Sequence, residues 1–174
     1  MSELDEAWEM ALAEAQRRAR VAGRGDVAEY LSLRASNDLA RSAGLDWLLS
    51  TFTVMAGEAN RAGASVQLTH ADAHRFAVGS ATMVGTLLTL RAGVRQLLVE
   101  AGWPREPRDG FVRGGGLACG NIKHFGLRGA DEELLLVRRG SEAPQWFVLE
   151  QTGARSPLTE ARMRRHLEKF IGPK

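Results

Sequence analysis

The spacing of apolar residues is helical near both ends of the chain and shifts toward alternation in between. It predicts helices over residues 2–23 and 26–61, with an interruption at Gly44, and a last helix that Ser156 caps and Pro157 opens. The second helix carries the clearest apolar stripe, which comprises Leu45, Leu48, Leu49, Phe52, Met55 and Ala59. We expect this stripe to be buried against a sheet.

Alternating apolar and polar residues predict strands in the middle of the chain. Two short strands are expected at residues 65–69 and 75–78, and a later pair at 133–138 and 146–150. Helices, then a run of strands, then a helix, without βαβ alternation, predict an α+β fold. We expect N-terminal helices packed on a mainly antiparallel sheet, with a C-terminal helix. The 174 residues are expected to form a single α+β domain.

The strongest hairpin signal lies in residues 84–101. If Ala92 and Gly93 form a two-residue turn, Leu88 faces Leu97 across the strands and Val94 belongs to the opposite face. One face of the hairpin is then apolar and the other mixed. This pattern is typical of an antiparallel sheet that helices cover on one side.

Composition narrows the class of protein. The chain is 44% hydrophobic and 25% charged, which excludes an intrinsically disordered protein. One cysteine excludes an internal disulfide framework, and the acidic N-terminus lacks the apolar segment of a signal peptide. The longest uncharged run, residues 76–90, is too short to span a bilayer. The excess of arginine over lysine is typical of a GC-rich bacterial genome, so we expect a bacterial protein. The single cysteine and the lack of a signal segment predict a cytoplasmic location. We expect no membrane binding.

Residues 101–126 depart from the surrounding pattern. They hold seven of the nineteen glycines, two of the five prolines and the single cysteine. From Gly102 to Arg128, five positive and two negative side chains give a net charge of +3, against +2 for the whole chain. Loops on a rigid scaffold often carry function, and arginine binds phosphate and carboxylate groups with two parallel hydrogen bonds. The stretch therefore predicts a binding module for an anionic partner, either nucleic acid or a phosphate-bearing ligand, without catalysis of its own.

Basic side chains interleaved with aromatic ones are typical of sites for phosphates or single-stranded nucleic acid. The predicted contact residues are Trp103, Arg105, Arg108, Arg113, Lys123 and His124. The expected C-terminal helix adds a basic series opposite its apolar face, formed by Arg162, Arg165 and Lys169. A structural interpretation stays open, in which the arginines of the stretch pair with Asp131, Glu132 and Glu133 on a solvated loop.

A metal protein is a second hypothesis. His70, Asp72 and His74 would lie on one face of a continuous strand, which is usable spacing for metal ligands. A turn between the two short strands would separate the three side chains. No second ligand group lies nearby in the sequence.

A cysteine enzyme is a related alternative. Cys119, with His124 as base and Asp109 to orient it, has the residue types of an activated nucleophile. Residues five apart on a strand face opposite sides, however, and most lone cysteines are small buried hydrophobic residues.

The glycines of the stretch do not predict a cofactor. Gly114, Gly116 and Gly120 form GxGxxxG, one residue longer than the dinucleotide fingerprint and without its flanking strand and helix. A third functional hypothesis is an interaction protein whose apolar helix face covers a partner or a second copy of itself. A homodimer therefore stays open.

Overall fold

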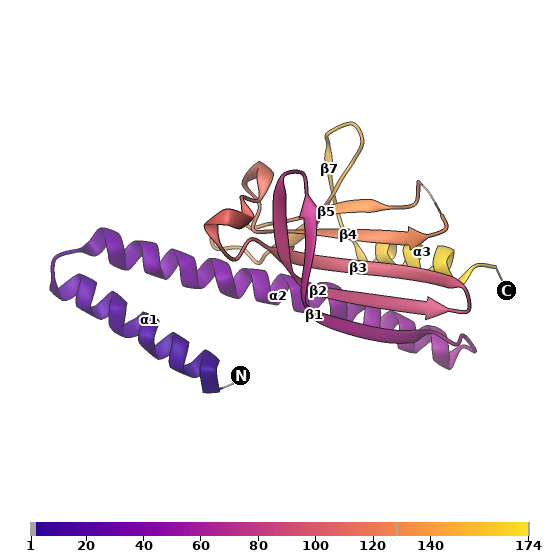
Figure 1. Cartoon of the computed structure of the whole chain (residues 1–174), viewed down its shortest axis with the longest axis horizontal. Coiled ribbons are helices and arrows are strands. Elements are labelled where there is room, and N and C mark those ends of the chain that lie inside the picture. Colours follow the sequence, from indigo (N-terminus) through magenta and orange to yellow (C-terminus); the bar gives the residue numbers. More distant parts are fainter. Residues whose placement is uncertain (1–2, 128, 174) are drawn as a thin grey trace. The chain divides into compact units, whose positions relative to one another are not determined.

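The computed structural model describes residues 3–127 and 129–173. Its helices are α1 (Glu3–Val21), α2 (Gly25–Arg61) and α3 (Glu160–Ile171), with two 3-10 turns, η1 (Pro107–Asp109) and η2 (Arg113–Gly115). Its strands are β1 (Gln67–Val78), β2 (Ala81–Ala92), β3 (Arg95–Trp103), β4 (Ala118–Phe125), β5 (Glu132–Val137), β6 (Gln145–Leu149) and β7 (Arg155–Pro157) (Figure 1). The expected α+β class, with N-terminal helices, an antiparallel sheet and a C-terminal helix, is confirmed.

The chain divides into two compact units, Met1–Ala40 and Arg41–Lys174. The first unit contains α1 and the beginning of α2. The expected helix end at Gly23 is confirmed, because α1 stops at Val21 and Gly23 has a left-handed φ of 73°. The organisation of the whole chain as a single domain stays a prediction.

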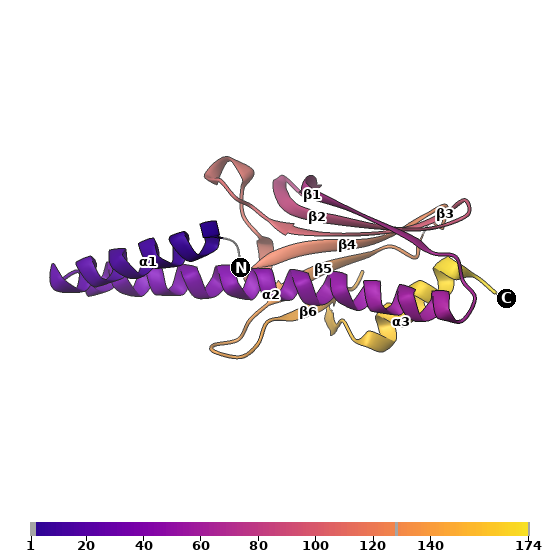
Figure 2. The same cartoon turned by 90° about the horizontal axis from the view of Figure 1, so that it is seen from below.

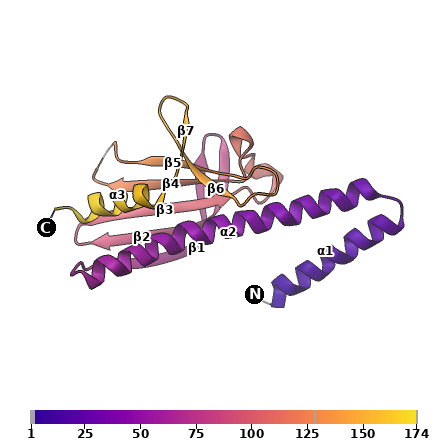
Figure 3. The ribbon, with the colours of Figure 1, turned by 180° about the vertical axis from the view of Figure 1, so that it is seen from behind.

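The second unit is built on a seven-stranded sheet in which each strand pairs with its neighbour in sequence, β1 to β7. All six strand pairs are antiparallel. The part of α2 from Arg41 onward and α3 cover the same face of this sheet (Figures 2 and 3). No helix in the described part of the chain is long and apolar enough to cross a bilayer.

The predicted stripe on α2 forms the helical side of the core. Leu48 and Phe52 are completely buried, as are Leu88 and Leu97 on the sheet face opposite. The expected interruption at Gly44 is wrong, because α2 is one continuous helix.

Gly44 instead allows the helix to approach the sheet closely. A Cβ atom there would lie 2.7 Å from Cδ2 of Leu136, which is closer than packed carbon atoms come. Trp146 on β6 donates its indole N–H to the carbonyl oxygen of Gly44 at 2.8 Å. The missing side chain thus serves helix–sheet packing and does not end the helix.

The turn of the β2–β3 hairpin lies one residue later than predicted. Ala92 pairs with Arg95, so Gly93 and Val94 form the turn, and Leu88 pairs with Val99 instead of Leu97. Gly93 has a φ of 62°, and two-residue hairpin turns favour a positive φ at their first position. When the turn shifts by one residue, the cross-strand partner of each β2 residue shifts by two residues along β3. Side chains alternate with a period of two, so the hairpin keeps one apolar and one mixed face.

The predicted strands at residues 65–69 and 75–78 are one strand, β1. A β-bulge between Ala71 and His74 absorbs the polar segment, and Ala73 adopts a φ of 51° there. Pairing with β2 continues on both sides of the bulge, so the chain does not turn.

The start of the last helix was also predicted too early. Ser156 and Pro157 belong to β7, and α3 begins at Glu160. Thr159 is the actual N-cap, because its side chain accepts a hydrogen bond from the backbone N–H of Arg162 at 3.1 Å.

Candidate functional site

Residues 104–117 connect β3 to β4, and we call them the Gly/Arg loop. Asp109 fastens this loop to the sheet. Its carboxylate is buried, accepts the backbone N–H groups of Arg105 and Glu106 at 3.1 Å each, and pairs with Arg75 on β1 at 2.9 Å. The hydrogen bond from the Arg105 backbone is the largest influence that lowers the pKa of Asp109, and Arg75 adds to it. Asp109 is therefore an ionised structural anchor.

Two predicted contact residues, Arg105 and Arg108, are in contact with neighbouring side chains and backbone. The Arg105 guanidinium lies 3.7 Å from the centre of the Trp103 ring and donates to the carbonyl oxygen of Val84. Arg108 forms an ion pair with Glu106. Both arginines are exposed, so these contacts orient the cations without removing them from solvent.

Arg113 differs from the other two arginines. Its side chain is exposed and forms no ion pair with any described residue. The next two residues, Gly114 and Gly115, have φ values of 74° and 71°. Arg155 on β7 donates a hydrogen bond to the carbonyl oxygen of Gly114 at 2.9 Å, which fixes this part of the loop to β7. The arginine thus lies next to a held glycine backbone.

Lys123 lies near the other end of β4, on the sheet face that α2 and α3 leave uncovered. It forms a 2.8 Å ion pair with Glu100, which is only 5% exposed. The same carboxylate accepts hydrogen bonds from His74 at 2.7 Å and Asn121 at 2.9 Å. Burial raises the pKa of Glu100, but the hydrogen bonds from Lys123, His74 and Asn121 outweigh burial and lower it. Glu100 is an ionised centre of a polar cluster on the sheet.

The predicted metal ligands are not brought together. His74 is bound to Glu100, whereas His70 and Asp72 are exposed on β1. The β-bulge between residues 71 and 74 breaks the alternation that would have placed all three on one face. Nowhere in the described chain do three His, Cys, Asp or Glu side chains gather in a metal-binding arrangement.

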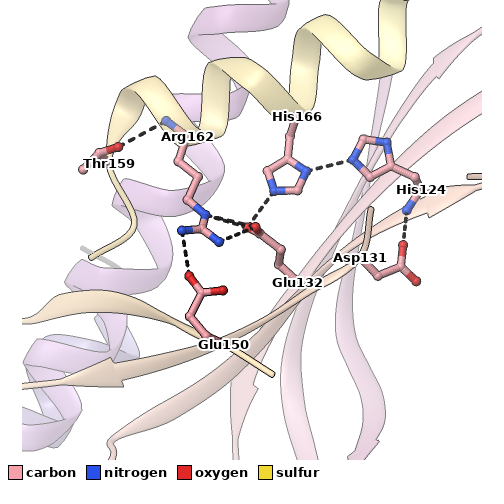
Figure 4. Close-up of polar contacts among 7 residues, drawn as sticks. All are labelled: His124, Asp131, Glu132, Glu150, Thr159, Arg162 and His166. Atoms are coloured by element: carbon pink, nitrogen blue, oxygen red, sulfur yellow. Dashed lines mark hydrogen bonds and ion pairs between the residues drawn. The ribbon is translucent and has the colours of Figure 1, made fainter. Parts of the chain in front are cut away.

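His124 lies on the helix-covered face and begins a polar chain that sequence spacing does not reveal (Figure 4). Its Nε2 lies 2.8 Å from Nδ1 of His166 on α3, and Nε2 of His166 lies 2.7 Å from Oε2 of Glu132 on β5. Arg162 also binds Glu132, at 2.6 Å, and reaches Glu150 at 2.9 Å. Burial raises the pKa of Glu132, but the His166 and Arg162 hydrogen bonds bring it down to about 2.

The ionised state of Glu132 determines where the protons lie on the two rings. A carboxylate only accepts, so Nε2 of a neutral His166 carries its proton and its Nδ1 is a bare acceptor. His124 must then donate from its Nε2, which leaves its own Nδ1 without a proton. That Nδ1 is buried and has no hydrogen-bond partner among the described residues. The arrangement therefore holds His124 neutral.

The basic series on α3 borders an open groove beside this network. Arg165, Lys169 and Lys123 are exposed there, whereas the paired Arg162 is partly buried. Four acidic residues line the same groove, namely Asp131, Glu132, Glu133 and Glu150. The four positive and four negative side chains balance, so the lining of this groove has no net charge.

Cys119 is buried in a small cluster with Phe76, Met83 and Leu135, on the face opposite His124. Burial raises the pKa of its thiol to about 11, so the thiolate needed for nucleophilic attack is scarce. The expected separation of Cys119 and His124 on opposite sides of the strand is confirmed.

The six predicted contact residues therefore fall into two groups. Trp103, Arg105, Arg108 and Arg113 lie around the Gly/Arg loop, whereas Lys123 and His124 lie toward the far end of β4 and on opposite faces. With a rise of about 3.3 Å per residue, Lys123 is roughly 16 Å along the strand from Ala118, where the loop ends.

Sequence reasoning missed the partners that give these residues their roles. Arg75, Glu100, Arg155 and His166 each meet a partner at least 26 residues away along the chain. Only pairing of the strands and docking of α3 bring them together, so no local spacing signals them. Comparison of the chain with protein-family models, with curated proteins and with solved structures finds no match.

Proposed function

We propose that the protein binds an anionic partner that carries phosphate groups, and that the Gly/Arg loop is the binding surface. The observation that supports this most is the exposed Arg113, which forms no ion pair with any described residue and directly precedes Gly114 and Gly115 in the chain. A guanidinium fork donates two parallel hydrogen bonds to a phosphate. Glycines with positive φ leave the backbone open, so its N–H groups can approach the same anion.

The charge around the loop favours the same partner. Five arginines surround it and two acidic residues, Glu106 and Asp109, oppose them; the arginines are Arg75, Arg105, Arg108, Arg113 and Arg155. The anchors at Asp109 and Gly114 already order the loop, so binding does not have to order it.

Aromatic side chains in and next to the loop favour a nucleic acid with unpaired bases over a small phosphate. Phe111 is 84% exposed, and Trp103 is half-buried under the Arg105 guanidinium. Bases stack on such rings while cations contact the backbone phosphates. Lys123 and His124 do not take part in this proposal, because one is bound to Glu100 and the other is buried against His166.

Fluorescence anisotropy with a labelled single-stranded oligonucleotide tests the proposal. Arg113→Ala should weaken binding on the order of tenfold and reduce the salt dependence by about one counterion, since one phosphate contact is lost. The free energy of unfolding should stay nearly unchanged, because an exposed arginine contributes little to stability. Arg91→Ala is the matched control, an exposed arginine at the β2–β3 turn.

Calorimetry with inorganic phosphate and pyrophosphate separates a small ligand from nucleic acid. Binding of these anions that requires Arg113, without oligonucleotide binding, would assign a small phosphate-bearing ligand to the loop. If neither probe binds, or if Arg91→Ala weakens binding as much as Arg113→Ala, the proposal fails.

A further inference from the structure

In the helical hairpin of the first unit, residues 3–40, no large apolar side chain whose burial the structure describes is fully buried. The buried side chains among its described residues are Ala19, Ala28 and Ala40, each of which contributes one methyl group. Long helices in water depend on packing of an apolar face and not on helix propensity alone.

Large apolar side chains of the hairpin point into solvent. Met10 and Val21 on α1 and Tyr30 and Leu33 on α2 are each more than half exposed. Eleven residues make about three helical turns, so Met10 and Val21 share one side of α1. Tyr30 and Leu33 are three residues apart and share one side of α2. Exposed apolar residues repeated on one helix side mark an interaction surface.

The charge distribution along α1 identifies the partner. Its first half is acidic, with Glu3, Asp5, Glu6 and Glu9 (net −4). Its second half carries Arg17, Arg18 and Arg20 together with Glu14, which pairs with Arg17 and Arg18, and its net charge is still +2. Two copies of such a helix attract each other when they run antiparallel, because each acidic half then lies along a basic half. A twofold axis produces this arrangement, in which the same surface serves both copies.

We propose that a second copy of this chain covers the hairpin. The two hairpins associate about a twofold axis, with the two α1 helices antiparallel and the exposed apolar side chains of both copies between them. Four helices then enclose a common core, as in a four-helix bundle. This dimer is independent of anion binding by the Gly/Arg loop.

Sedimentation velocity of the full-length protein over a range of concentrations measures the association. The wild-type chain should sediment as a dimer, and Tyr30→Ser combined with Leu33→Ser should sediment as a monomer. Val54→Ser is the matched control, because Val54 is exposed on α2 in the second unit. It should leave the dimer intact.

A charge-exchange experiment tests the antiparallel contact directly. One variant carries Arg17→Glu, Arg18→Glu and Arg20→Glu, and the other carries Glu3→Lys, Asp5→Lys, Glu6→Lys and Glu9→Lys. Each variant alone should be monomeric, because both halves of its α1 then carry net charge of the same sign. An equimolar mixture should form a heterodimer, which also shows that both variants fold.

Three results would overturn the proposal. The first is a wild-type chain that is monomeric at every concentration. The second is a dimer that survives the Tyr30→Ser and Leu33→Ser changes. The third is a pair of monomeric charge variants that do not associate when mixed.

Discussion

His124 on β4 and His166 on α3 share a hydrogen bond of 2.8 Å between their ring nitrogens, inside the contact between the sheet and the C-terminal helix. Glu132 fixes the proton of His166 on the side away from His124. In this pattern a neutral His124 on β4 joins the sheet to His166 on α3. A second proton on His124 would require a donor position at a buried Nδ1 that has no acceptor among the described residues.

Stability should fall as pH decreases below the ordinary histidine range. Burial is the main cause that lowers the pKa of His124 from 6.5; nearby His166 and Lys169 lower it further, whereas Asp131 and Glu132 oppose them. Below about pH 6.5 the unfolded chain binds a proton at this residue that the folded protein does not. The contribution of neutral His124 to the free energy of unfolding is thus complete above pH 6.5 and is lost as the pH falls below that value. One proton corresponds to at most about 1.4 kcal/mol per pH unit.

Urea unfolding at a series of pH values measures this effect. His124→Gln keeps an N–H donor for His166 but cannot titrate, so its free energy of unfolding should change less steeply with pH. His70→Gln removes an exposed histidine and should leave the dependence unchanged. An identical pH dependence in wild type and His124→Gln would contradict the assignment.

Gly44→Ala should destabilise the protein even though alanine is the better helix former. The added Cβ would lie 2.7 Å from a methyl carbon of the fully buried Leu136, so the core must shift, typically at about 1–3 kcal/mol. Gly57→Ala on the same helix is the matched control. Its Cβ would lie 3.7 Å from the Arg61 side chain, an ordinary contact, so it should stabilise by about 0.5–1 kcal/mol.

Chemical denaturation of both glycine variants gives the comparison. Gly44→Ala should lower the free energy of unfolding, and Gly57→Ala should raise it. Equal stabilisation by both would mean that α2 does not approach the sheet closely at Gly44.

Phe52→Ala should reduce the free energy of unfolding by about 3–5 kcal/mol, because it removes a fully buried ring between α2 and the sheet. Val54→Ala, two residues along the same helix, removes a side chain that is 59% exposed and should change stability by less than about 0.5 kcal/mol. Urea titrations monitored by circular dichroism measure both. A loss below about 1 kcal/mol for Phe52→Ala would place this stripe at a surface instead of in the core.

The sequence by itself determined the elements whose signal is local. The stripe from Leu45 to Met55 has one helical period and one apolar face, so burial of that face follows from neighbouring residues alone. The strands β5 and β6 follow from short alternating runs in the same way. The exposure of Arg113 also agrees with its glycine-rich surroundings.

Tertiary structure decided how the helices and strands pack and where the turns lie. Gly44 breaks a helical pattern when the sequence is considered alone, yet the helix continues because packing against Leu136 and the bond from Trp146 outweigh its poor propensity. The hairpin turn lies one residue later than predicted, because its first position needs a left-handed φ and Gly93 supplies it. Both outcomes depend on geometry that propensity does not describe.

The polar networks are the clearest case of dependence on tertiary structure. Glu100 and Glu132 are ordinary acidic residues in the sequence. Each becomes the centre of a polar cluster only when strand register and the docking of α3 bring cations and imidazoles to it. Hydrogen bonds act over about 3 Å, whereas the partners are tens of residues apart along the chain. The sequence therefore determined which groups could ionise, and the fold decided which of them meet.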